Sequence, residues 1–198
     1  INMNSCISEP YIVSSYKSHN EMNSNNINDI YIDEEKRIWI ANYPEGITII
    51  DNRYKSYNWI KHSIGNRQSL VNDQVHSVIE DSDGDLWFGT SNGISLYQSK
   101  TGQWHSFLSS FDHQLKNKNH IFITLCEVSP GIIWAGGYTS GVYKINKRTL
   151  SVEYFSPYLL NPDNIRPDKY IRDIVKDSKG YIWSGGFYNL KRINLKTQ

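Results

Sequence analysis

The sequence predicts an all-β fold, a segment of a β-propeller built of four-stranded antiparallel blades. Two observations predict it. A tryptophan returns at a nearly constant spacing, and each copy of the repeat around it divides into short runs typical of β-strands. The tryptophans are Trp39, Trp87, Trp134 and Trp183, which lie 48, 47 and 49 residues apart. Repeats of about 40 to 50 residues with four strands each are typical of propeller blades.

Several other positions keep step with the tryptophan. The positions nine and twelve residues before it are apolar in every copy: Ile30, Val78, Leu125 and Ile174, and Ile27, Val75, Phe122 and Ile171. The position three residues before it is glycine in three copies and Lys36 in the first. The position six residues before it is aspartate in three copies and Val128 in the third. Each copy therefore reads as an apolar strand, a tight turn and a second strand that carries the tryptophan.

The second and third repeats show all four strands. In the second repeat we expect strands over Val75–Asp81, Leu86–Thr90, Ile94–Tyr97 and Gln103–Leu108. In the third we expect them over Phe122–Val128, Ile133–Gly136, Val142–Asn146 and Ser151–Phe155. Such a blade is apolar on both faces and needs a neighbour on each side to bury them.

The two ends of the chain have different strand patterns. Residues 11–18 resemble a fourth strand that stands before the first repeat, and Leu190–Asn194 matches a third strand with no fourth behind it. We therefore expect residues 1–198 to form a single propeller segment, either a closed four-bladed ring or an arc of a larger ring. The chain begins at Ile1 without an initiator methionine or a signal peptide, and we expect it to be part of a longer protein.

Charge and motif patterns exclude several classes of function. The 21 basic and 20 acidic residues are interspersed, so the sequence has no basic patch for nucleic acid or an anionic membrane. The histidines lack metal-ligand spacing, and we expect no metal and no cofactor. The run Asp81–Asp85 resembles the start of a calcium loop, but Asn92 stands where a bidentate glutamate would be needed. A hairpin turn explains this run better.

The motif from Val78 to Ile94 resembles the two-component regulator propeller repeat, whose pattern is an apolar strand, E-D-x-x-G-x-L-W, an apolar residue, G-T and x-x-G-I or x-x-G-L. Residues 174–186 repeat this motif, and residues 30–46 and 125–141 are looser copies. The resemblance implies a larger propeller of about seven blades. It also implies the non-catalytic, periplasmic sensor region of a bacterial hybrid two-component histidine kinase. Many members of the family sense oligosaccharides and regulate glycan-utilisation genes.

Loop residues are the first candidates for a ligand site. In a propeller blade the loop between the second and third strands lies on the same face as the segment that leads into the first strand. The candidates in these loops are Tyr43, Asn92, Tyr138, Phe187 and Tyr188. Exposed aromatic rings beside amides suit a sugar, because the ring stacks on C–H faces and the polar groups bind hydroxyls. The alternative is that these rings pack between adjacent blades.

The first strands offer a second set of candidates. Ten residues before each tryptophan lie Asp29, Ser77, Thr124 and Asp173, next to Asn28, His76, Ile123 and Arg172. Of these we select Asp29, His76, Arg172 and Asp173 as candidate ligand contacts. Ordinary water-filled lining of a central channel is the competing interpretation.

Two other functional classes compete with the sensor interpretation. A glycosidase would need two carboxylates across one pocket, and Asp29 and Asp173 are the pair to consider. However, the sequence has no catalytic motif, and its acids recur with the repeat, so we assign no catalytic residue. A protein-interaction scaffold would need a broad apolar or singly charged face. The partners we expect are an oligosaccharide, the remainder of the receptor and a second receptor copy.

Overall fold

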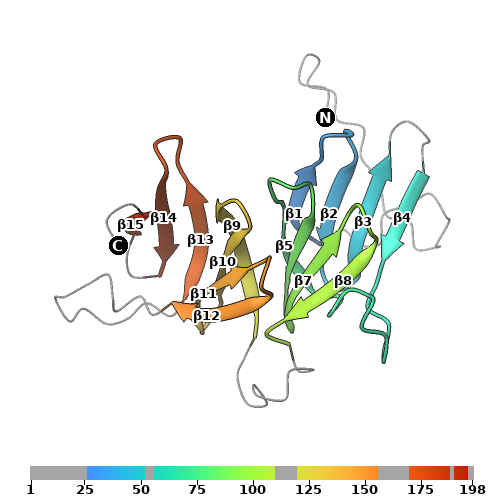
Figure 1. Cartoon of the computed structure of the whole chain (residues 1–198). Coiled ribbons are helices and arrows are strands. Elements are labelled where there is room, and N and C mark those ends of the chain that lie inside the picture. Colours follow the sequence, from blue (N-terminus) through green and yellow to red (C-terminus); the bar gives the residue numbers. More distant parts are fainter. Residues whose placement is uncertain (1–25, 52–55, 110–119, 156–169, 188–189, 196–198) are drawn as a thin grey trace.

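The computed structural model describes residues 26–51, 56–109, 120–155, 170–187 and 190–195, which form four antiparallel sheets side by side (Figure 1). We call the sheets blades 1 to 4. Blade 1 contains β1 (Ile27–Ile32), β2 (Ile38–Asn42), β3 (Gly46–Asp51) and β4 (Ser56–Ile60). Blade 2 contains β5 (Val75–Glu80), β6 (Leu86–Thr90), β7 (Gly93–Gln98) and β8 (Gln103–Phe107). Blade 3 contains β9 (Phe122–Ser129), β10 (Ile132–Gly137), β11 (Gly141–Asn146) and β12 (Ser151–Phe155). Blade 4 contains β13 (Ile171–Lys176), β14 (Tyr181–Gly186) and β15 (Leu190–Asn194).

The all-β propeller architecture predicted from the sequence is confirmed. Strands β6 and β12 have the predicted bounds, and the other strands of blades 2 and 3 differ by one residue at either end. Blade 4 has three strands among the described residues, as its sequence pattern predicts. The outer strand expected near residues 11–18 lies outside the described residues. No described segment forms a helix that could cross a membrane.

The hairpin between the first two strands of a blade is held by one aspartate. In blade 2, the Asp81 carboxylate accepts hydrogen bonds from the backbone N–H groups of Asp83 and Asp85 and from the indole N–H of Trp87, at 3.0, 3.1 and 2.8 Å. Gly84 occupies the left-handed position of the turn, with φ of 83°. The prediction that the run 81–85 is a hairpin turn is therefore confirmed.

The same aspartate–indole bond recurs in blades 1 and 4. Asp33 accepts it from Trp39 and Asp177 from Trp183, each at 2.8 Å. Burial alone would raise the pKa of Asp33, but hydrogen bonds from Trp39 and Arg37 outweigh it and lower the pKa. The hydrogen bond from Trp183 lowers the pKa of Asp177. The motif spacing of six residues therefore has a physical origin, since it lets the aspartate that directly follows the first strand bond to the tryptophan of the second strand.

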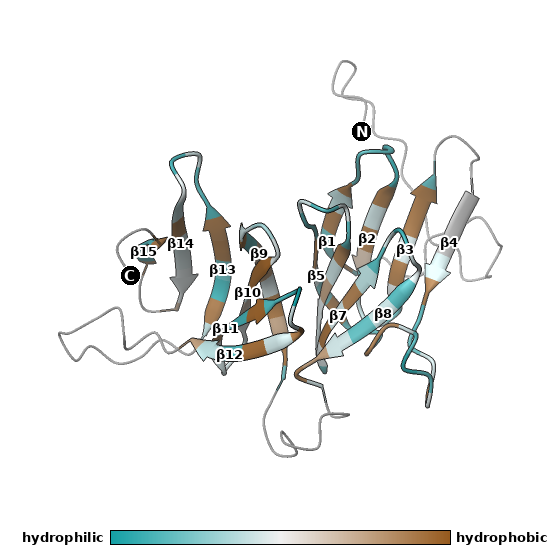
Figure 2. Cartoon of the chain, in the orientation of Figure 1, coloured by the Kyte–Doolittle hydropathy of each residue, from teal (hydrophilic) through white to brown (hydrophobic). Residues whose placement is uncertain are grey.

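The hydrophobic core lies between neighbouring blades. Trp87 packs in one cluster with Phe122 and Leu125 of blade 3, and Trp134 packs in another with Ile171 and Ile174 of blade 4. Trp39 likewise contacts Phe88 of blade 2, with ring centroids 6.1 Å apart. Figure 2 shows the apolar residues concentrated in the strands and the polar ones in the hairpins. Trp39, Trp87 and Trp134 are core residues between blades, since each is at most 3% exposed, whereas Trp183 of the last described blade is half-buried.

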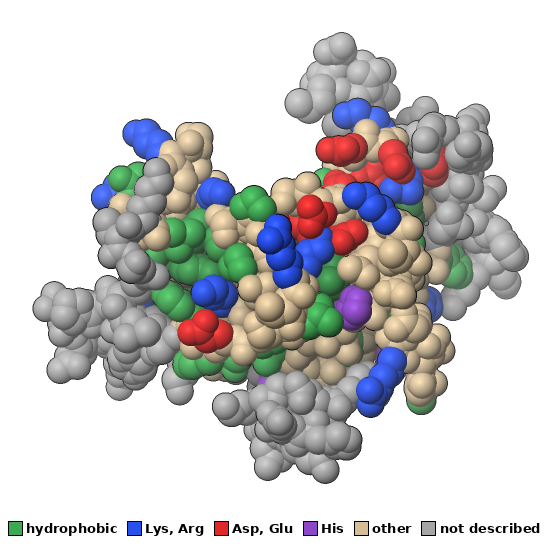
Figure 3. Space-filling model, viewed as in Figure 1, with side chains coloured by type: hydrophobic (Ala, Val, Ile, Leu, Met, Phe, Trp, Pro, Cys, Tyr) green, Lys and Arg blue, Asp and Glu red, His purple; other side chains and the backbone are tan. Residues whose placement is uncertain are grey.

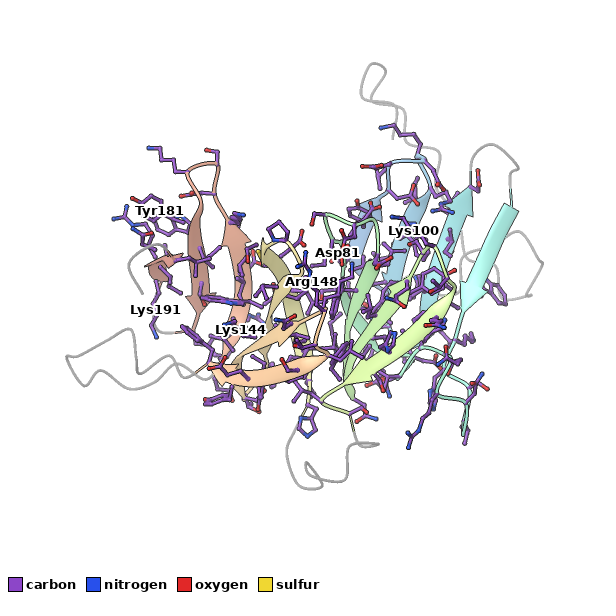
Figure 4. All side chains as sticks on the ribbon, in the orientation of Figure 1. Asp81, Lys100, Lys144, Arg148, Tyr181 and Lys191 are labelled. Atoms are coloured by element: carbon purple, nitrogen blue, oxygen red, sulfur yellow. The ribbon has the colours of Figure 1, made fainter. Side chains whose placement is uncertain are left out.

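A lysine of blade 3 joins this blade to the β5–β6 hairpin of blade 2. Lys147 follows β11, and its ammonium group lies 2.7 Å from Asp81, 2.9 Å from Asp83 and 2.8 Å from Asp85. We call this group the Lys147 clasp; Figure 3 shows acidic and basic side chains gathered in this region, and Figure 4 shows Asp81 between the two blades. The lysine occupies the position where a calcium loop would hold its cation.

No described segment covers the outer faces of the first and last blades. On β1, Ile30 and Ile32 point away from blade 2 and are 54% and 57% exposed. In blade 4, Val175 and Leu190 are 50% and 67% exposed. Contacts run from each blade to the next in chain order. The described blades therefore form an arc rather than a closed four-bladed ring.

Candidate functional site

The loops between the second and third strands lie beside the segments that lead into the first strands, as predicted. The backbone N–H of Tyr43 donates to Asn26, that of Ser91 to Gln74, and that of Tyr138 to Ile121, at 2.8 to 3.0 Å. We call this side of the arc the loop face. It lies at the opposite end of the strands from the β1–β2 and β13–β14 hairpins, which point upward in Figure 1.

Every first strand carries a bulge at the loop face. Register shifts interrupt the pairing of β1, β5, β9 and β13 with their second strands. The residue without a pairing partner in each strand is Asn28, His76, Ile123 or Arg172. A bulge re-aims the side chain of its extra residue and often does so beside a functional site. Each first strand therefore has, near its start, one side chain whose direction departs from the regular alternation of the strand.

Blades 1 and 2 bring polar groups together at the loop face. Asn28 donates to the carbonyl of Val75 at 2.7 Å and lies 3.4 Å from Nδ1 of His76. Nε2 of His76 lies 2.8 Å from the hydroxyl of Ser91. The Tyr43 ring is 6.1 Å from the His76 ring. Burial lowers the pKa of His76, so this imidazole is neutral at neutral pH and offers hydrogen bonds rather than charge.

Blades 3 and 4 bring aromatic rings together on the same face. Tyr138 lies edge-on to Tyr170 at 5.2 Å, and Tyr170 lies edge-on to Phe187 at 4.7 Å. The guanidinium of Arg172 lies over the Phe187 ring at 5.3 Å. Tyr138 is 38% exposed and Phe187 is 53% exposed. We call these four residues the aromatic cluster. The rings contact one another, and two of them remain partly exposed. The cluster therefore offers a ligand apolar ring surface together with the cation of Arg172.

The polar residues of the first strands form bonds between blades. Asp29 accepts hydrogen bonds from the N–H groups of Ile30 and Val78, both at 2.9 Å, and Val78 belongs to the next blade. Thr124 accepts one from Ile174 of the next blade at 3.2 Å and donates one to Asp173 at 3.1 Å. A first strand has no further partner in its own sheet, so side chains of the preceding blade satisfy its free N–H groups. Asp29 and Asp173 therefore act as links between blades.

The electrostatic environment of Asp29 follows from this position. Burial raises its pKa, the hydrogen bonds from Val78 and Ile30 oppose this, and the charge of Asp173 adds to the increase. The charge of Asp173 thus acts on Asp29 across the arc. Ser77 occupies the equivalent position in blade 2, where its buried hydroxyl has no hydrogen-bond partner among the described residues.

The structure distributes the predicted site residues over these groups. Tyr138, Phe187 and Arg172 meet in the aromatic cluster, whereas Tyr43 and His76 meet at blades 1 and 2. Asn92 lies in the β6–β7 turn, where its N–H donates to the Thr90 hydroxyl at 3.1 Å. Tyr188 lies outside the described residues. No group of three or more His, Cys, Asp or Glu side chains suited to a metal ion occurs in the described part of the chain.

Sequence reasoning missed Tyr170, the central ring of the aromatic cluster. Tyr170 lies thirteen residues before Trp183, at the same repeat position as Asn26, Gln74 and Ile121. Those three residues accept the backbone hydrogen bonds that define the loop face. Comparing the thirteenth position across the repeats would have identified Tyr170 as a loop-face residue.

Two stretches of the chain match a family model. Residues 21–43 and 69–92 match the model described as the two component regulator propeller. These ranges include the first strand, hairpin and second strand of blades 1 and 2. A search of curated proteins gave no significant match.

Solved structures share the fold. The extracellular domain of a hybrid two component system from B. thetaiotaomicron superposes with a TM-score of 0.77 at 22% identity, covering 93% of this chain and 24% of that one. A second such domain from the same organism gives a TM-score of 0.63 at 21% identity, covering 86% of this chain and 21% of that one. An auxiliary nutrient binding protein from Bacteroides ovatus gives 0.59 at 14% identity, covering 87% and 40%. The chain spans about a quarter of the first structure's length.

Proposed function

We propose that this chain, whose blades carry two component regulator propeller repeats, is part of the extracytoplasmic sensor region of a hybrid two-component histidine kinase. In this proposal the segment is non-catalytic, lies in the periplasm and binds an oligosaccharide to regulate glycan-utilisation genes. Its partners are the remainder of the receptor and a second receptor copy. Ligand binding would signal by favouring one of two receptor arrangements.

The aromatic cluster carries the proposal. Tyr138 and Phe187 expose ring surface at the end of the strands, and Tyr170 holds both by edge-on contacts. Sugars bind through stacking of their C–H faces on such rings together with hydrogen bonds from nearby polar groups. The polar groups lie on the same face: Asn28 and His76 at blades 1 and 2, and Arg172 in the cluster itself.

The positions of Asp29 and Asp173 favour a sensor over a glycosidase. A glycosidase needs one carboxyl group to donate a proton and another to act as base or nucleophile. Asp29 accepts hydrogen bonds from two backbone N–H groups, and Asp173 accepts one from Ile174 and one from Thr124. Both carboxylates thus take part in hydrogen bonds between neighbouring blades.

Substitution of Tyr138 tests the proposal. We expect the chain to bind at least one oligosaccharide from a panel of plant and host glycans in a calorimetric titration. The Tyr138→Ala variant should bind it about fivefold more weakly, because a stacking ring contributes roughly 1 kcal/mol. The control is Trp59→Ala on the outer strand β4, which removes a ring of the same 38% exposure.

Two outcomes would contradict the proposal. One is the absence of binding by every glycan in the panel. The other is turnover of a glycan, detected by product analysis of the same mixtures. Loss of folding in Tyr138→Ala, measured by circular dichroism, would instead show that this ring is blade core, and Phe187→Ala would then be the variant to titrate.

A further inference from the structure

Arg172 lies at the loop face and forms no ion pair with the described residues. Its guanidinium lies over the Phe187 ring at 5.3 Å, and the side chain is exposed. Several other cations of the chain do form ion pairs. Arg37 pairs with Asp33 and Glu35, Lys61 with Glu45, and Lys147 with three aspartates.

The fold holds this guanidinium in place. Arg172 is the bulged residue of β13, so the bulge turns its side chain out of the regular alternation of the strand. The contact with Phe187 orients the planar group, and Tyr170 in turn contacts Phe187 edge-on at 4.7 Å. An oriented guanidinium presents parallel N–H donors that match a carboxylate or a sulfate in a bidentate arrangement.

The carboxylate next to this cation in sequence is engaged by other groups. Asp173 follows Arg172 in sequence, but its Oδ1 accepts hydrogen bonds from the Thr124 hydroxyl at 3.1 Å and from its neighbour's N–H at 2.9 Å. Oδ1 of Asp173 is thus engaged at the junction with blade 3. Among the described residues, no carboxylate forms an ion pair with Arg172.

We infer that the ligand of the loop face is an acidic oligosaccharide, with a carboxylate or sulfate group bound by Arg172 beside a sugar ring stacked on the aromatic cluster. This inference rests on the proposed function and narrows its ligand class. A uronate carboxylate and a sulfate group both present charged oxygens to a guanidinium. The structure therefore assigns an anionic group, and the experiment distinguishes uronate from sulfate.

The test uses matched pairs of oligosaccharides. The 198-residue chain is titrated with uronate-bearing oligosaccharides and their methyl esters, and with sulfated oligosaccharides and their desulfated forms. We expect an acidic member of one pair to bind at least tenfold more tightly than its neutral counterpart, since a hydrogen bond to a charged group contributes about 1.5 to 3 kcal/mol. Binding of the acidic member should weaken as salt is raised.

Two arginine variants identify the residue. Arg172→Gln should lower the affinity for the acidic member about tenfold or more and leave the affinity for the neutral member nearly unchanged. The control is Arg192→Gln in the same blade. Arg192 also lies over aromatic rings, those of Tyr181 and Trp183, but at the other end of β14. Both variants should keep the melting temperature of the unmodified chain, because both side chains are exposed.

The outcomes separate this inference from the function on which it rests. Equal or tighter binding of neutral oligosaccharides, or acidic binding that Arg172→Gln does not weaken, overturns the inference and leaves the sensor proposal standing. The absence of binding by every acidic and neutral member overturns both.

Discussion

At the scale of single residues, the repeat is maintained by a hydrogen bond and a backbone conformation. The bond joins an aspartate to the tryptophan six residues later in blades 1, 2 and 4. The conformation is the left-handed turn position three residues before the tryptophan. Glycine occupies it in blades 2, 3 and 4, with φ of 83°, 74° and 83°, whereas Lys36 occupies it in blade 1 with φ of 66°. A side chain at this φ costs free energy that glycine avoids.

Lys36→Gly should therefore stabilise the chain. We expect the free energy of unfolding to rise by about 1 kcal/mol, because the left-handed conformation is unfavourable for a residue with a Cβ atom. Urea denaturation monitored by tryptophan fluorescence measures the change. The reciprocal variant Gly84→Ala is the control and should lose about as much; a Cβ there would meet nothing closer than Glu80, at 3.5 Å. A Lys36→Gly variant less stable than the unmodified chain would refute the argument.

At the scale of elements, the blades are joined by side chains that reach across from one sheet to the next. Asp29 bonds to the first strand of blade 2, Thr124 bonds to that of blade 4, and Lys147 bonds to the hairpin of blade 2. Burial by itself would lower the pKa of Lys147, but the hydrogen bonds that it donates to three aspartates outweigh this and raise it. Lys147 is therefore charged at neutral pH, and it compensates carboxylates that the blades bury.

Lys147→Met should destabilise the chain strongly. The substitution leaves the buried Asp81 and Asp85 carboxylates without their cation, and we expect a loss of about 3 kcal/mol in the free energy of unfolding. Chemical denaturation at neutral pH measures it. The neighbouring exposed Arg148 is the matched control, and Arg148→Met should change the stability by less than about 0.5 kcal/mol. Equal effects of the two substitutions would show that the clasp contributes little.

The pH dependence of the same variant gives an independent check. The hydrogen bond from Lys147 lowers the pKa of Asp83 below its ordinary value of 3.8. A carboxyl group whose pKa is lower in the folded state contributes stability above its unfolded pKa, and that stability is lost as the pH falls through the folded pKa. Lys147 has a raised pKa, so its contribution is present below 10.5 and is lost only as the pH rises through the higher folded value. The Lys147→Met variant should therefore lose less stability on acidification than the unmodified chain.

At the scale of the whole molecule, the blades form an arc with an apolar surface at each end. Trp183 illustrates the difference from the inner blades: its counterparts Trp39, Trp87 and Trp134 pack against a following blade, whereas Trp183 is partly exposed beneath Arg192. Val175 and Leu190 extend this surface, and Ile30 and Ile32 form the one at the other end. Apolar surfaces of this kind are the usual sites of association between proteins or domains.

Charged substitutions at one end should suppress self-association of the chain. We expect the double variant Val175→Lys/Leu190→Lys to sediment as a smaller species than the unmodified chain at high concentration and to bind less of a hydrophobic dye. Its stability should change by less than about 0.5 kcal/mol at each position, because both side chains are exposed. The control Val152→Lys removes an exposed valine from the outer strand β12 and should leave self-association unchanged. A double variant that associates as strongly as the unmodified chain would contradict the expectation.

Much of the fold was predictable from the sequence because its determinants are local. The alternation of apolar residues, the glycine turns and the aspartate–tryptophan spacing all act within one blade. Strands β6 and β12 were accordingly predicted at their observed bounds. The sequence also predicted that the loops carrying Tyr138 and Phe187 lie on one face, because strand order alone places them.

The contacts within that face depend on how one blade packs on the next, and no local pattern encodes them. Tyr170 enters the aromatic cluster because blades 3 and 4 bring its ring between Tyr138 and Phe187. Lys147 reaches Asp81 across 66 residues of sequence. Asp29 is engaged by Val78 because the first strand of blade 2 has an N–H group with no partner in its own sheet. The local spacing of residues thus determines the blades and the order of their strands. Contacts between side chains of different blades, in contrast, form only when the blades pack against one another.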